Sequence, residues 1–196
     1  MANNDSKIIL QYHTYFLTFT IVGWVDLLAR RHCKNILIES LNYCIEKKGL
    51  NIYAYVIMSN HLHLIASATE EGIGLSGIIR DFKKFTSKEM ITWMLATKKE
   101  SRRHWMLDIF KAFGLQTYRN ENFQIWNHDS HPYLLTSPNH LRQKLDYIHL
   151  NPVKAGLVRK TEDYIYSSAG NYAGRTDNVL EISVLDLGEE IGRVYT

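Results

Sequence analysis

Two short apolar stretches, separated by only three polar residues, constrain the fold of this chain more than any other feature. Ile52–Met58 and Leu62–Ala68 both have the composition of a β-strand, and Ser59–Asn60 forms the turn between them. This spacing predicts a β-hairpin. Because successive side chains of a strand point to opposite faces, His61 and His63 share one face of the sheet, and the leucine between them enters the core on the other.

Further strand and helix patterns surround the hairpin. In chain order, the residues predict a strand, a helix, the hairpin, a long helix, a strand and a helix, which cover Tyr12–Ile21, Cys33–Lys48, Ile52–Ala68, about Leu75–Ala96, Phe123–His128 and Ser137 to about Asn151. This order is typical of an α+β fold with a ferredoxin-like (RRM-like) antiparallel sheet and helices packed on one face.

The length and composition fit one globular domain. The chain has 196 residues, of which 45% are hydrophobic, enough to bury a substantial core. We expect a single domain over residues 1–196, with an insertion or short helix near residues 98–115, where the sequence is charge-rich, and an irregular tail from about residue 173. The formal net charge of +3 permits nucleic-acid binding, but any DNA site has to come from local clusters of basic residues.

Cysteine usage and hydropathy indicate the cellular compartment in which the protein is expected. Cys33 and Cys44 are the only cysteines, and on one helix they are roughly 16 Å apart, too far for a disulfide. The N-terminus lacks the charged-then-apolar order of a signal peptide, and the apolar stretch Tyr15–Val25 is too short to span a bilayer. We therefore expect a cytoplasmic protein without a membrane segment.

The two histidines are a candidate site for a divalent metal, although the chain has nine histidines and half-exposed surface histidines are the simpler interpretation. A second segment, Leu145–Val158, supports the metal site. On its helix Tyr147 and Asn151 are four residues apart and share a face, with Lys144 beside them. One helix can thus present a phenol, an amide oxygen and an ammonium group to one site. The alternatives are a tyrosine at the edge of the core and a helix-end asparagine.

These two motifs together resemble the HUH single-tyrosine transposases, and most closely the REP-associated tyrosine transposases and their insertion-sequence relatives. The similarity comprises His-Leu-His after YVIMSN, the long basic helix and DYIHLNPVKAGLV, and it extends over about Tyr12–Tyr172. The resemblance implies that His61 and His63 bind Mg²⁺ or Mn²⁺, that Tyr147 attacks DNA, and that Asn151 completes the metal shell. It also places His128 where relatives keep a histidine, as a support of the active site.

The resemblance implies single-stranded or hairpin DNA as the substrate. Candidate phosphate contacts are the basic residues of the long helix, of the predicted insertion and of the tyrosine helix, namely Arg80, Lys83, Lys84, Lys88, Arg102, Arg103, Lys144 and Lys154. Phe82 and Phe85, between the lysines, are expected in the core. Arg102 and Arg103 either bind the stem of a DNA hairpin or belong to an exposed loop.

The expected activity is therefore that of a DNA transposase. It would cleave and rejoin single-stranded DNA through a covalent 5′-phosphotyrosine, aided by the metal ion. Two alternatives stay open: a domesticated protein that binds hairpin DNA without catalysis, and an RNA-binding module on the same sheet. A monomer and a homodimer are both open, and the apolar tail around Val179–Leu187 either forms an interface or packs on its own domain.

Overall fold

The computed structural model describes residues 7–116, 122–128 and 131–186. The main elements, in chain order, are β1 (Tyr15–Thr20), α1 (Arg31–Lys48), β2 (Leu50–Ile57), β3 (His61–Ala68), α2 (Gly74–Ala96), α3 (Arg103–Leu115), β4 (Tyr133–Leu134), α4 (Pro138–Lys154) and α5 (Ala169–Tyr172). Three short 3₁₀ turns complete them, η1 (Val22–Trp24), η2 (Leu27–Ala29) and η3 (Thr161–Asp163).

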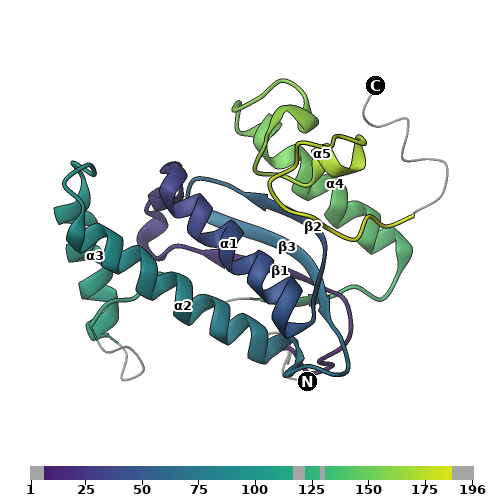
Figure 1. Cartoon of the computed structure of the whole chain (residues 1–196), viewed down its shortest axis with the longest axis horizontal. Coiled ribbons are helices and arrows are strands. Elements are labelled where there is room, and N and C mark those ends of the chain that lie inside the picture. The colour runs from purple at the N-terminus through teal and green to yellow at the C-terminus, as the bar shows by residue number, and fades with distance from the viewer. Residues whose placement is uncertain (1–6, 117–121, 129–130, 187–196) are drawn as a thin grey trace, which may run out of the picture.

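The four strands form one antiparallel sheet in the order β2-β3-β1-β4. With the chain order of strands and helices, this is the ferredoxin-like arrangement that the sequence predicts. The hairpin is also confirmed, since β2 and β3 pair directly across the turn. Figure 1 shows α1 and α2 side by side along the sheet, with α3 beyond one end of α2 and α4 at the far side of the molecule.

Both faces of the sheet are covered. The larger core lies between the sheet and helices α1 and α2, and it contains Leu62 of β3. The smaller core joins the opposite face to α4, where Leu145 and Ile148 pack against Phe16 and Ile65. The prediction of helices on one face therefore holds for α1 and α2, and the tyrosine helix adds a layer on the other face. His63 points to the side on which α4 lies, because it alternates with Leu62.

The predicted fourth strand at Phe123–His128 is wrong. This segment joins β1 only through a single bridge between Ile21 and Trp126, and β4 lies further along the chain. Its apolar residues are buried for another reason: the Trp126 indole packs against α2 and donates a hydrogen bond to Thr86 Oγ1 at 3.0 Å. A short apolar run predicts burial, but it does not specify strand pairing.

Two boundaries and one burial prediction also differ. β1 begins at Tyr15 instead of Tyr12. The charge-rich segment near residues 98–115 forms α3 over most of its length, which agrees with the short helix predicted there as an alternative to an insertion. Helix α4 continues past Asn151 to Lys154 with Pro152 inside it, because the missing N–H of one proline removes a single hydrogen bond while the next turn still closes. Phe85 is 52% exposed, in contrast to the expected core position.

The described part of the C-terminal tail, up to residue 186, packs on its own domain, and Leu187 of the predicted apolar stretch lies outside the described residues. Leu180 is buried in the larger core, and Ser183 donates its backbone N–H to the carbonyl of Ile52 on β2 at 2.9 Å. Cys33 and Cys44 are buried free thiols, in keeping with the predicted absence of a disulfide. In the described parts of the chain, no helix has the length and apolar character needed to cross a bilayer.

Candidate functional site

His61 and His63 lie next to each other on β3, as the alternation of the strand predicts. Their ring centroids are 4.7 Å apart, with the planes close to perpendicular. His63 is almost fully buried, and Phe16 of β1 stacks on its ring at 5.2 Å. Both imidazoles are held by the rigid centre of the sheet, so their relative position needs little reorganisation when a ligand binds.

Each histidine has an oxygen partner at Nδ1. His63 Nδ1 lies 2.9 Å from Thr18 Oγ1, and His61 Nδ1 lies 2.7 Å from Asn60 Oδ1. With the ring proton on Nδ1, each ring donates to its oxygen partner and keeps a lone pair on Nε2. His63 Nε2 is buried and has no hydrogen-bond partner in the structure. A buried nitrogen without a partner is costly, and a metal ion would satisfy it.

The protonation state of the pair also suits a metal. Burial, together with the nearby His61 and Lys144, lowers the pKa of His63 to about 3. Burial likewise lowers the pKa of His61. Because a proton and a metal compete for the same lone pair, a neutral imidazole at pH 7 is ready to bind a cation without first losing a proton.

Tyr147 reaches this pair from α4. Its ring centroid lies 5.2 Å from that of His63 and 5.9 Å from that of Phe16, with the rings edge to face. The tyrosine is 42% exposed, so the phenol is open to a substrate. Leu145 and Ile148, buried on the neighbouring stripe, hold this face of α4 against the sheet. One chain therefore brings together the histidines and the tyrosine that the sequence places more than 80 residues apart.

Lys144 adds a positive charge beside the tyrosine. Its ammonium nitrogen lies 4.7 Å from the centroid of the Phe16 ring, 5.3 Å from that of Tyr133 and 5.8 Å from that of Tyr147. Cation–π attraction holds the side chain in this position, and among the described residues no carboxylate forms an ion pair with it. The site can thus attract an anion such as a phosphate.

The site offers two imidazole nitrogens as ligands for the predicted Mg²⁺ or Mn²⁺ ion. Within the described residues, His, Cys, Asp and Glu form no group of three that could hold a metal. A cation at His61 and His63 would need a further ligand of another type, and the amide of Asn151, one helical turn beyond Tyr147, is the predicted one. Amide oxygen and water are ligands that Mg²⁺ and Mn²⁺ accept, whereas imidazole is a more usual ligand of zinc and other transition metals.

The sequence reasoning missed a residue that anchors the tyrosine helix. His149 is fully buried, its Nε2 lies 2.9 Å from Ser168 Oγ, and its ring contacts Tyr172 edge to face. Ser168 in turn accepts a hydrogen bond from the backbone N–H of Tyr55 on β2 at 2.9 Å. The helical spacing of His149 from Leu145 would have identified it as a buried position.

The predicted DNA contacts divide into two groups. Lys84, Lys88 and Lys154 are exposed, and Arg80 is exposed with an ion pair to its neighbour Asp81. The others make internal contacts. Arg102 pairs with Asp26 and with Glu100, Arg103 donates to the carbonyl of Thr97, and Lys83 donates to that of Asn127. Burial lowers the pKa of Lys83 to about 8.

His128 lies near the same end of the sheet as His61. The preceding residue, Asn127, donates its backbone N–H to the carbonyl of Thr20 at 2.8 Å, and Thr20 is the β1 partner of His61. The imidazole of His128 is exposed. Its supporting role in the active site stays a prediction, with which a position near His61 is consistent.

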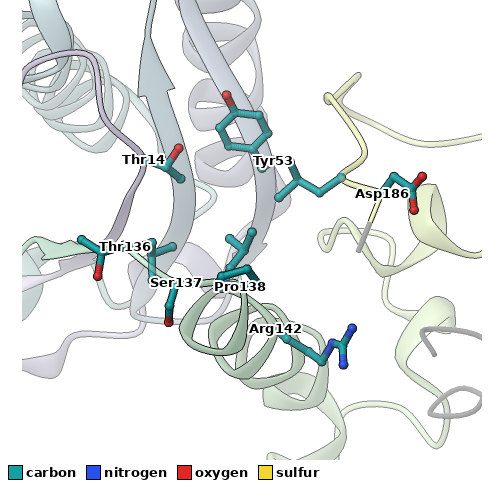
Figure 2. Close-up of a pocket in the computed structure, with 10 residues that line it drawn as sticks. Thr14, Tyr53, Thr136, Ser137, Pro138, Arg142 and Asp186 are labelled. Carbon is teal, nitrogen blue, oxygen red and sulfur yellow. The ribbon is translucent and has the colours of Figure 1, made fainter. Parts of the chain in front are cut away.

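An open groove of about 540 Å³ lies elsewhere, where β2 and the C-terminal tail meet the first turns of α4. Tyr53 lines it from β2, and Ser137 and Pro138 line it from the start of α4 (Figure 2). Tyr147 is nine residues further along this helix, or roughly 14 Å. The groove therefore does not contain the histidine–tyrosine site.

The comparisons with known proteins agree with this geometry. The model of the IS200-like transposase family matches residues 10–124, which is more than half of the chain and includes both histidines. A solved structure of a REP-associated tyrosine transposase bound to a REP hairpin is similar in fold, with a TM-score of 0.62, 19% identity and coverage of 94% of this chain and 96% of that one. A comparison with curated proteins yields no match.

The family match includes both histidines, whereas Tyr147 lies outside the matched residues, and its role stays a prediction with which its contact with His63 is consistent. With a family model that covers both histidines and more than half of the sequence, and a ferredoxin-like sheet that carries them, this chain belongs to the IS200-like transposases, a family of HUH single-tyrosine transposases.

Proposed function

We propose that this protein cleaves and rejoins single-stranded DNA beside hairpins, with Tyr147 as the nucleophile. The observation that carries the proposal is the contact between the Tyr147 and His63 rings within one chain, at 5.2 Å between centroids. It brings an accessible phenol to two neutral imidazoles with free Nε2 positions. A tyrosine at the edge of a core would not need this neighbour.

The residues of the chain account for the bond changes. The Tyr147 oxygen attacks the phosphorus, a Tyr–O–P bond forms, and the bond from phosphorus to the DNA 3′-oxygen breaks. The phenol proton leaves, and the departing 3′-oxygen takes up a proton. A second strand with a free 3′-OH reverses these steps and displaces the tyrosine, so the DNA is rejoined without hydrolysis and without ATP. Lys144 balances part of the charge of the attacked phosphate.

We propose that His61, His63 and Asn151 hold Mg²⁺ or Mn²⁺. When bound, such an ion polarises a phosphate and stabilises the charge that develops on it. The buried Nε2 of His63 supports this assignment, because it otherwise lacks any partner. Thr18 and Asn60 keep the two rings in the orientation that presents Nε2.

Hairpin DNA is the proposed partner. The solved structure with a similar fold holds a REP hairpin, which supports the same class of ligand here. The exposed lysines Lys84, Lys88 and Lys154 are the proposed phosphate contacts, with Lys144 at the reacting phosphate. Arg102 and Arg103 are weaker candidates, because both guanidinium groups already bind oxygen atoms of the protein.

The experiment is an adduct assay on a denaturing gel. Labelled hairpin DNA with unpaired flanks, taken from the borders of the gene, is incubated with Mg²⁺ or Mn²⁺. We expect a covalent protein–DNA adduct that disappears with EDTA, with Tyr147→Phe and with His61→Ala. Tyr43→Phe, which alters an exposed tyrosine on α1, is the matched control and should keep the adduct.

Other outcomes select other functions. Cleavage that persists in Tyr147→Phe would show that the nucleophile is misassigned. Tight binding of hairpin DNA without any adduct, with both metals and both flanks, would indicate a domesticated binding protein. Preference for RNA, unaffected by EDTA, would indicate an RNA-binding module on the same sheet.

A further inference from the structure

Trp24, in the turn that follows β1, combines an exposed side chain with an unfavourable backbone. Its indole is 72% exposed, although burial of a tryptophan is strongly favoured. Its φ is 55°, and among the residues that the structure describes it is the one non-glycine with a positive φ. For a bulky side chain this conformation costs free energy, and such strain persists only where the surroundings impose it.

The surroundings of Trp24 do impose this conformation. Val22 and Val25, on either side, are both buried in the larger core. The backbone N–H of Val22 donates to the carbonyl of Ile125 at 2.9 Å, and that of Trp24 donates to the carbonyl of Ile21 at 3.2 Å. Anchors on both sides therefore hold the turn, and the indole is presented to solvent by a rigid support.

The turn lies directly beside the histidine site. The carbonyl of Trp24 is 3.5 Å from the amide nitrogen of Asn60, and the amide oxygen of the same Asn60 is 2.7 Å from His61 Nδ1. The backbone carbonyl of Asn60 also accepts a hydrogen bond from the N–H of Ile21 at 2.9 Å. One asparagine thus connects the exposed tryptophan with the proposed metal ligand.

We propose that Trp24 is a stacking platform for an unpaired base of the DNA strand, next to the phosphate that Tyr147 attacks. An exposed aromatic face on a rigid backbone is what base stacking requires, and it accepts any base. This inference rests on the proposed function, because it assumes that single-stranded DNA passes over His61. It adds a binding residue for the unpaired flank, separate from the lysines that contact phosphates.

The backbone strain supplies a sharp test. In Trp24→Gly the strained φ becomes favourable and little buried surface is lost, because the residue is 72% exposed, so the urea midpoint of unfolding should stay equal or rise. The same variant should bind a hairpin with an unpaired flank about 5- to 150-fold more weakly, the range measured for loss of one stacked base. Trp24→Phe, which keeps a ring, should lose less affinity than Trp24→Gly.

Two probes isolate the flank. Fluorescence anisotropy compares the flanked hairpin with the same hairpin without a flank, in EDTA so that no cleavage occurs. We expect Trp24→Gly to weaken only the flanked probe. Trp105→Ala, which removes the exposed indole of α3, is the control and should leave the ratio of the two affinities unchanged.

Several results would overturn the inference. The first two are an equal loss of affinity of Trp24→Gly for both probes and no loss for either. The third is a wild-type affinity that does not depend on the flank. The fourth is a change of oligomeric state in Trp24→Gly, which would place Trp24 in an interface between copies. The assay needs no cleavage, so it can succeed when the Tyr147 adduct is not found. It can also fail while that adduct forms, which would leave the proposed function intact.

Discussion

Lowering the pH from 7 to 5 should destabilise this fold through His149, the buried histidine of the tyrosine helix. Burial lowers the pKa of His149 to about 3, from the ordinary value of 6.5. At pH 5 the histidine of the unfolded chain binds a proton, whereas the folded protein keeps it neutral. Because the folded pKa is the lower one, the stabilisation is fully present above about pH 6.5 and is lost progressively as the pH falls toward 3.

The magnitude follows from the two pKa values. From pH 6.5 down to pH 5, a span of about 1.5 pH units, the unfolded imidazole is mostly protonated while the folded one is neutral. Each pH unit of this span lowers the free energy of unfolding by about 1.4 kcal/mol. His149 alone should therefore cost about 2 kcal/mol of stability at pH 5. This is a large part of the roughly 5–15 kcal/mol that holds a typical domain together.

The assay is urea unfolding at pH 7 and pH 5, followed by tryptophan fluorescence in EDTA. Wild type and His149→Gln are compared, since glutamine can still reach Ser168 and does not titrate. We expect the variant to lose about 2 kcal/mol less than wild type between the two pH values. His13→Gln removes an exposed imidazole as the control. Equal losses in wild type and His149→Gln would refute the reasoning.

Four further outcomes are expected. Tyr147→Phe should bind flanked hairpin DNA with unchanged affinity, measured by anisotropy, while forming no adduct. A mixture of Tyr147→Phe and His63→Ala should stay inactive in the adduct assay, because both groups come from one chain; restored activity would indicate an active site shared in a dimer. Thr18→Val should weaken Mn²⁺ binding by about 10- to 100-fold in a calorimetric titration, because it frees the His63 ring, whereas Thr14→Val should not. Ile148→Ala should lower the free energy of unfolding by about 2–5 kcal/mol in urea, because it empties the contact between α4 and the sheet.

Local patterns were sufficient for most elements of the fold. Alternation over Ile52–Met58 and Leu62–Ala68 predicts the hairpin, because a pleated strand and a two-residue turn leave few other structures open. The same alternation places the histidines on one face. The weak points are Phe123–His128 and Phe85, where apolar character predicts burial but cannot specify the partner or the face of the helix that meets the core.

The candidate site was predictable in its components but not in its assembly. The helical spacing of Tyr147 and Asn151, with Lys144 beside them, follows from the sequence. The packing of α4 on the face of the sheet opposite α1 and α2 does not, since nothing local tells an amphipathic helix which face to cover. His149, between the motif residues, shows the same limit, because its partner Ser168 belongs to a different segment.

The sequence by itself determined which side chains share a strand face or a helix face, because these periodicities are set by backbone geometry within a few residues. Only the tertiary structure decided that the tyrosine meets the histidines within one chain, and that Trp24 is strained and exposed beside them. Both depend on contacts between segments far apart in the sequence, such as the hydrogen bond from Val22 to Ile125 and the packing of Leu145 on the sheet. Such contacts follow from how the whole chain fills its core, and no short stretch of residues encodes them.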